Sequence, residues 1–96
     1  MKVVWSGRAI RHFVALRAYI AKDSEQNAAR VATRILKAVD VLQTQPEVGR
    51  PGRLLGTREL VVPGTPYIIP YRLRGERLEL TAVFHGRQQW PAKGTF

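Results

Sequence analysis

The first half of the chain carries apolar residues at helical spacing. From residue 7 to about residue 22, four of them follow a 4-3-4 spacing that lines one face of a helix. A second stretch repeats the pattern until Pro46, which ends it. Ser6 is suited to cap the first helix, and Asp23 followed by Gln26 resembles a capping box for the second. We predict two antiparallel helices joined by a tight turn, with these apolar positions: Ala9, Phe13, Leu16 and Ile20, widened by Ile10, Val14 and Tyr19, then Ala28, Val31, Ile35, Val39 and Leu42.

Short β-favouring runs flank the helical pair. Residues 3–5 form one such run, and a loop rich in Pro and Gly occupies residues 46–57. Three further runs, 58–62, 67–74 and 77–85, are separated by short turns, which is typical of an antiparallel meander. The order β-α-α-β-β-β predicts an α+β fold in which the helical hairpin packs on one face of a small antiparallel sheet. At 96 residues, the chain is expected to form one domain over its whole length, 1–96.

Alternation along the last two runs assigns side chains to the two faces of the sheet. Tyr67 and Tyr71 share one row, and Arg72 lies on the opposite face, which we expect to be open. With the last two runs paired through a tight hairpin at Gly75-Glu76, we expect His85 to lie on the face of Arg72 as well. The two would then lie about 15–20 Å apart, from a rise of roughly 3.3 Å per residue. Pro70 cannot donate to a strand ladder, so we expect a sheet edge or a bulge there.

Net charge is the feature of composition that narrows the function most. The chain has 16 Lys and Arg against 7 Asp and Glu, which gives a formal charge of +9. The basic residues are spread over both halves of the chain, so they decorate the folded body rather than a tail. A folded domain with this charge is expected to bind an anionic partner, either nucleic acid or an acidic protein. The alternative is a basic surface that serves only solubility.

The composition also excludes several kinds of chemistry. The absence of Cys excludes disulfides, thiolate zinc sites and Cys nucleophiles. With two histidines, His12 and His85, we expect neither a metal site nor a cofactor. No secretory signal and no apolar run of membrane-spanning length is visible in the sequence. We therefore expect no membrane partner, and the cytoplasm is the expected location.

Several short motifs, taken in order along the chain, resemble the RelE/ParE toxin superfamily. No single motif is specific, but their order and spacing from residue 3 to residue 91 are. The motifs are Val3-Val4-Trp5-Ser6, Tyr19-Ile20-Ala21 with Asp23, Gly49-Arg50-Pro51-Gly52-Arg53, Gly56-Thr57-Arg58-Glu59-Leu60-Val61-Val62, Tyr67-Ile68-Ile69 with Tyr71-Arg72, and Val83-Phe84-His85-Gly86-Arg87-Gln88-Gln89-Trp90-Pro91.

The resemblance implies a toxin of a bacterial type II toxin–antitoxin module, which an acidic cognate antitoxin neutralises in a hetero-oligomer. Family members divide by target: RelE-like toxins cleave mRNA on the ribosome, and ParE-like toxins inhibit DNA gyrase. The nuclease branch commonly has Arg directly after the first aromatic of the middle strand and a Tyr near the C-terminus. Here Ile68 stands at the first position, and no Tyr follows Tyr71. The resemblance thus favours a non-enzymatic, ParE-like gyrase inhibitor, with a metal-independent, ribosome-dependent mRNA endonuclease as the alternative.

Candidate residues follow from these two alternatives. Metal-free RNA cleavage needs a proton acceptor, a proton donor and cations that stabilise the phosphorane charge. If the chain is a nuclease, its catalytic residues are expected to be His85, Arg58, Arg72 and Arg87. The expected target-binding residues are Arg50, Arg53, Arg58, Arg72, Arg87 and Trp90, and the expected antitoxin-binding residues are Phe13, Arg17, Ile20, Arg34 and Tyr71.

The candidates also have purely structural interpretations. His85 can be a strand-end side chain bonded to a loop carbonyl, and Trp90 can cover the end of the sheet. Arg58 and Glu59 can form cross-strand ion pairs, which contribute little energy on a surface. A different functional class is a small basic nucleic-acid-binding protein. The helical hairpin lacks the turn of a helix-turn-helix, and the strands lack the aromatic pattern of single-strand binders, so this class is less favoured.

Overall fold

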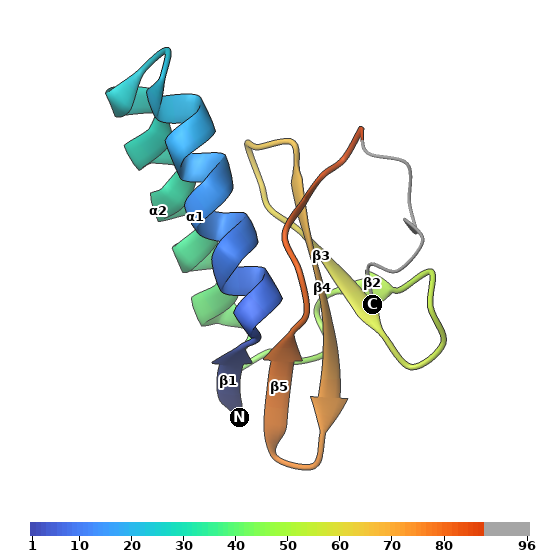
Figure 1. Ribbon diagram of the computed structural model, residues 1–96. Helices are drawn as coiled ribbons and strands as arrows, with labels where there is room; N and C mark the ends of the chain where they lie inside the picture. Colours follow the sequence, from blue (N-terminus) through green and yellow to red (C-terminus); the bar gives the residue numbers. More distant parts are fainter. Residues whose placement is uncertain (88–96) are drawn as a thin grey trace.

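The computed structural model describes residues 1–87. Its elements follow the predicted order β-α-α-β-β-β, with two very short strands, β2 and β6, added to it (Figure 1). The elements are β1 (Lys2–Trp5), α1 (Gly7–Ala21), α2 (Glu25–Val41), β2 (Arg50–Pro51), β3 (Arg58–Val61), β4 (Tyr67–Arg74), β5 (Arg77–Leu80) and β6 (Phe84–His85).

Side-chain caps fix where both helices begin. The hydroxyl of Ser6 accepts a hydrogen bond from the backbone amide three residues later, at 3.0 Å, so the predicted cap of α1 is confirmed. The predicted cap of α2 is wrong by one residue, because Ser24 rather than Asp23 accepts from the amide three residues later. The amides of Asp23 and Ser24 both donate to the carbonyl of Ile20, which keeps Asp23 within the turn that ends α1.

The strands form a sheet with the order β1-β5-β4-β3-β2, and β6 also pairs with β4. Strands β3, β4 and β5 form the predicted antiparallel meander. Strand β1 pairs parallel to β5, from Lys2 opposite Arg77 to Trp5 opposite Leu80, so the sheet is mixed rather than wholly antiparallel. The connection that leaves β1 runs through both helices, and such a long connection lets a strand return in parallel. The helical hairpin lies on one side of this sheet (Figure 1).

A bulge interrupts the run that the sequence presents as one last strand. Tyr71 pairs with Leu80, but Tyr67 pairs with His85 rather than with Phe84, so one extra residue lies between β5 and β6. Because side chains alternate along a strand, a one-residue shift moves every following side chain to the other face. His85 therefore lies on the face of Tyr67, with their ring centroids 5.5 Å apart, and the expectation that it shares a face with Arg72 is wrong. The bulge that Pro70 predicted is confirmed, since the interruption lies opposite this residue.

The hydrophobic core lies between the helical hairpin and the sheet. Helix α2 supplies buried side chains such as Val31 and Ile35, whereas Ala9 is the one buried residue of α1. Phe13 is half-buried and packs edge-on against Trp5, with 5.4 Å between ring centroids. α1 thus covers the rim of the core and keeps much of its surface in solvent.

Three apolar residues of α1 that were expected to widen its buried face are exposed instead. Ile10, Val14 and Tyr19 expose 49%, 60% and 69% of their surface, respectively. They lie outside the 4-3-4 spacing, which defines the side of α1 that packs against the core. Their exposure becomes relevant to binding below.

Candidate functional site

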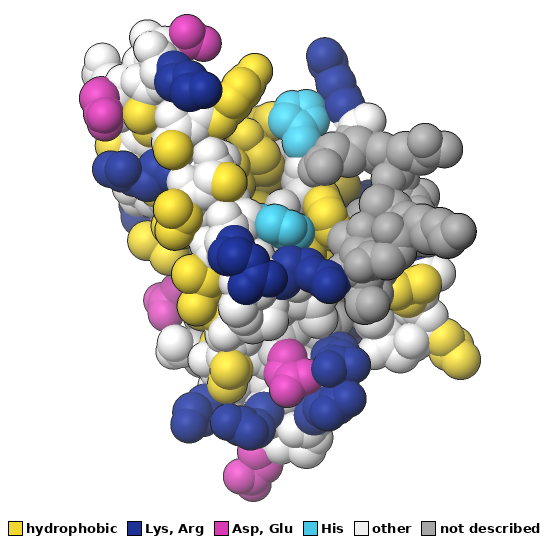
Figure 2. Space-filling view, viewed as in Figure 1, with side chains coloured by type: hydrophobic (Ala, Val, Ile, Leu, Met, Phe, Trp, Pro, Cys, Tyr) yellow, Lys and Arg dark blue, Asp and Glu magenta, His cyan; other side chains and the backbone are white. Residues whose placement is uncertain are grey.

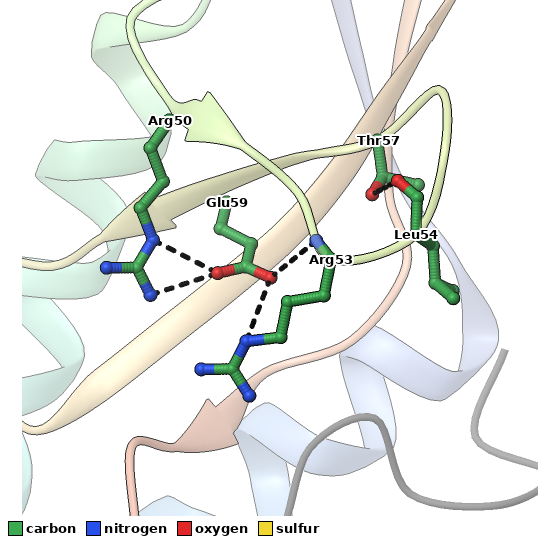
Figure 3. Close-up of polar contacts among 5 residues, drawn as sticks. All are labelled: Arg50, Arg53, Leu54, Thr57 and Glu59. Carbon is green, nitrogen blue, oxygen red and sulfur yellow. Dashed lines mark hydrogen bonds and ion pairs between the residues drawn. The ribbon is translucent and has the colours of Figure 1, made fainter.

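A buried carboxylate holds the loop between β2 and β3. Glu59 of β3 is 2% exposed, and its Oε1 accepts from Nε and Nη2 of Arg50 at 3.1 and 2.9 Å (Figure 3). Its Oε2 accepts from the backbone amide of Arg53 at 3.2 Å and lies 3.7 Å from Nε of the same residue. Glu59 therefore pairs with Arg50, which lies directly opposite on β2, and with Arg53. The predicted cross-strand ion pair is present, but its carboxylate is buried rather than on the surface.

The rest of this loop, residues 52–57, closes on itself. The amide of Gly52 donates to the carbonyl of Thr57 at 2.7 Å, and the hydroxyl of Thr57 donates to the carbonyl of Leu54 at 2.6 Å (Figure 3). A Cβ on Gly52 would lie 2.9 Å from the backbone of Thr57, so this close approach requires Gly. Gly56, at the tip of this loop, has φ +80°. The side chain of Leu55, the residue before it, is fully exposed to solvent.

Tyr71 is a core residue and not a surface one. Its side chain is 0% exposed, its hydroxyl donates to the carbonyl of Pro46 at 2.8 Å, and it accepts from the amide of Gly49 at 2.9 Å. Burial raises the pKa of this hydroxyl. Tyr71, which was expected to contact an antitoxin, therefore lies in the core and presents no surface to a partner. Arg58 also binds the segment that follows α2, since its Nη1 donates to the carbonyls of Glu47 and Gly49.

Arginines from two elements line one hollow beside the N-terminal end of α1. We call it the arginine groove: it is lined by Arg8 and Arg11 of α1, Leu54 and Leu55 of the loop, and Arg72 of β4, and it encloses about 440 Å³. Figure 2 shows basic side chains gathered on this face, over the start of α1 and over the hairpin of β4 and β5. Sequence reasoning found Arg72 but missed both arginines of α1. The sequence did contain a signal for them: two basic residues, three positions apart, lie near the start of a predicted helix, where acidic residues are usual.

Arg72 keeps one acidic partner on the open face of the sheet. Its Nε donates to Oε1 of Glu79, directly opposite on β5, at 2.8 Å, and Arg74 lies 3.6 Å from the same oxygen. Two guanidinium groups thus share one carboxylate. Positive charge remains in excess at this end of the groove.

The titratable rings gather in a different hollow. It encloses about 480 Å³ where α1 meets β6, and His12, Tyr67 and His85 line it. Nδ1 of His12 accepts from the amide of Val83 at 3.2 Å. Burial foremost, and then the charges of two arginines on the same helix, lower the pKa of His12. Burial also raises the pKa of Tyr67. None of the described residues that line this hollow is Lys or Arg.

The remaining predicted site residues are dispersed. Nδ1 of His85 accepts from the amide of Arg87, whose side chain is exposed, and Trp90 lies outside the described residues. Of the residues expected to bind an antitoxin, Phe13 and Ile20 are half-buried against the core and Arg17 is exposed. Arg34 is exposed and bonds the carbonyl of Pro63 at 3.4 Å.

The helices carry an exposed apolar surface that the sequence prediction did not single out. We call it the helix stripe: Ile10 and Val14 of α1 with Leu36 of α2, which are each about half exposed or more. Tyr19 is also exposed, but it lines the hollow of the titratable rings. None of these residues lines the arginine groove. Ile10 and Val14 lie one turn apart on the same side of α1, and neighbouring exposed apolar side chains of this kind are typical of protein-binding surfaces.

Two further observations concern residues 1–87. Nowhere in this part do three His, Cys, Asp or Glu side chains come together as a metal-ligand set. Neither of its helices has the length and apolar character needed to cross a membrane.

Comparison with known proteins places the chain in a family. A family model described as the ParE toxin of the type II toxin–antitoxin system parDE matches residues 3–90. The chain is 49% identical over 90 residues to the putative toxin Y4kP of Sinorhizobium fredii, covering 94% of this chain and 93% of that protein. It is 34% identical over 84 residues to the toxin RelE2 of Caulobacter vibrioides, covering 88% and 93% of the two chains.

The fold also matches a solved structure. A chain of the chromosomal ParDE toxin–antitoxin system from P. aeruginosa superposes with a TM-score of 0.79 at 23% identity, covering 88% of this chain and 95% of that one. This agreement concerns the fold, in which two helices pack on a mixed sheet. Together with the family match over residues 3–90, it leads to one conclusion: the chain belongs to the ParE toxin family and is a toxin of a type II toxin–antitoxin system.

Proposed function

We propose that this toxin arrests growth by binding and inhibiting DNA gyrase, and that it does so without catalysing a reaction. The observation that supports this proposal is that His85 and Arg72, the expected proton-transfer group and the expected charge-stabilising cation, lie on opposite faces of the sheet. His12, Tyr67 and His85 line one hollow, whereas Arg8, Arg11 and Arg72 line another. Metal-free RNA cleavage needs both kinds of group around one phosphate.

The bulge before β6 is the physical reason for this separation. It directs His85 toward Tyr67 on one face of the sheet, while Arg72 pairs with Glu79 on the other face. The expected nuclease set of His85, Arg58, Arg72 and Arg87 is thus not gathered around one point among the described residues. A protein target needs no such convergence, because separate contacts over a surface suffice for binding.

The cognate antitoxin is the second partner in this proposal. An acidic segment that folds as it binds would cover the helix stripe with an apolar helix face, while its carboxylates meet exposed cations such as Arg17. The resulting complex would be a toxin–antitoxin hetero-oligomer. Both partners place the toxin in the cytoplasm.

Induction of the toxin in cells tests the proposal. We expect plasmid DNA to lose negative supercoiling and purified gyrase to be inhibited, with no codon-dependent cuts in a reporter mRNA by primer extension. The variant His85→Gln is the sharp comparison: it should stay toxic if the toxin binds gyrase, and lose toxicity if His85 transfers protons in RNA cleavage.

The ribosome-dependent endonuclease remains the second candidate, because one of the relatives is named RelE2. Discrete cuts in mRNA with unchanged supercoiling would support that candidate and refute gyrase as the target.

A further inference from the structure

The arginine groove combines two cations that the described part of the chain leaves unpaired. Within residues 1–87, neither Arg8 nor Arg11 makes an ion pair with a carboxylate. Arg8 also lies in the first turn of α1, which contains no acidic residue. The positive end of the helix dipole repels a cation at this position. Helix stability therefore does not explain these arginines.

An exposed apolar residue stands at the rim of the same groove. Leu55 exposes its whole side chain, the most of any large apolar residue described. The loop that carries Leu55 is held by several contacts (Figure 3). Glu59 binds Arg50 and Arg53 on one side of the loop, and the hydroxyl of Thr57 donates to the carbonyl of Leu54 across it. A rigid loop that holds an apolar side chain in water favours docking, because little conformational entropy is lost on binding.

From these two features we propose that the arginine groove is the docking site for an acidic segment of the toxin's protein target. Carboxylates of the segment pair with Arg8 and Arg11, and an apolar side chain beside them packs on Leu54 and Leu55. Charge complementarity supports this occupant, since the lining residues within 1–87 include three arginines and no carboxylate. The inference rests on the proposed function in one respect, that the target is a protein.

The lining of the groove disfavours a nucleic-acid occupant. None of its described lining residues is aromatic, so bases would find no ring on which to stack. Phosphates would use the arginines but would leave Leu55 without a role. The groove is also distinct from the helix stripe, which we assign to the antitoxin, so target and antitoxin contacts can be separated by mutation.

Growth arrest after induction, in the full-length protein, is the first readout. We expect Leu55→Ser and Arg11→Glu each to weaken toxicity about tenfold or more, the loss typical of a central contact residue. The matched controls are Val48→Ser, an apolar residue that is 50% exposed outside the groove, and Arg77→Glu, an exposed cation of β5. Both controls should remain toxic. Co-purification with the antitoxin is the second readout, and all four variants should retain it, which also shows that they fold.

The possible outcomes decide between the alternatives. Loss with Arg11→Glu but full toxicity with Leu55→Ser would indicate phosphate contacts and overturn the proposal. Full toxicity of both variants, or loss of antitoxin binding together with toxicity, would overturn it as well. Supercoiling tests the target separately: if the groove variants lose toxicity while the wild type leaves gyrase unaffected, the docking site stands and gyrase as the target falls.

Discussion

Removal of one hydroxyl should destabilise this protein substantially. Tyr71 is fully buried, and its hydroxyl joins β4 to the segment that follows α2 by bonding Pro46 at 2.8 Å and Gly49 at 2.9 Å. The variant Tyr71→Phe keeps the ring and its packing but leaves a buried amide and a carbonyl without their partner. Each such group costs about 1–3 kcal/mol, and the carbonyl of Pro46 is partly reached by water, so we expect a loss of about 2–4 kcal/mol.

The measurement is urea or thermal unfolding of the purified toxin, followed by circular dichroism. For a domain of this size the loss corresponds to a fall in Tm of roughly 10–25 °C. Tyr67→Phe is the matched control, because the hydroxyl of Tyr67 makes no hydrogen bond among the described residues, and its removal should change stability by less than about 0.5 kcal/mol. Equal stabilities of the two variants would refute the reasoning.

Three further predictions concern other buried contacts. Glu59→Gln should lower the free energy of unfolding by about 1–2 kcal/mol in urea titrations. The carboxylate is buried, but its arginine partners are about half exposed, which limits the energy of the ion pairs. An unchanged unfolding midpoint would contradict this prediction. Ser6→Ala should cost about 1–2 kcal/mol, because the hydroxyl caps α1 and also donates to the carbonyl of Thr81 at 3.2 Å, whereas exposed Thr44→Ala should cost much less. The pKa of His12 is lowered by folding, so the unfolded chain binds more protons; its contribution to stability is complete above about pH 6.5 and is lost as the pH falls below that value. Unfolding titrations between pH 7.5 and 5 should show this loss in the wild type and not in His12→Asn.

The sequence predicted the helical hairpin and the meander well, because their signals are local. A Ser at the cap position and apolar residues at 4-3-4 spacing lie within one helix, and short turns join neighbouring strands. The bulge before β6 could not be read in the same way. Ala82, Val83 and Phe84 are all apolar and all buried, so the alternation that would reveal a one-residue shift is missing there. The face of His85, and with it the expected site geometry, depended on that shift.

The site was less predictable than the fold because its contacts link distant parts of the chain. A Glu within Arg58-Glu59-Leu60-Val61 resembles a solvent-facing strand residue, and only the return of Arg50 and Arg53 explains its burial. Tyr71 was assigned to a surface because an aromatic residue in a strand suits either binding or packing. The carbonyl and amide that hold its hydroxyl lie more than 20 residues earlier in the chain.

The parallel pairing of β1 with β5 has a consequence for the timing of folding. The chain's first strand finds its partner only in residues 77–80, and the cap of α1 bonds a carbonyl 75 residues away. During synthesis from the N-terminus, β1 therefore has no partner strand until almost the whole chain has been translated. The side of α1 that lines the groove likewise lacks its contacts until then. An antitoxin already present in the cell has that interval in which to meet the exposed helices before the sheet is complete.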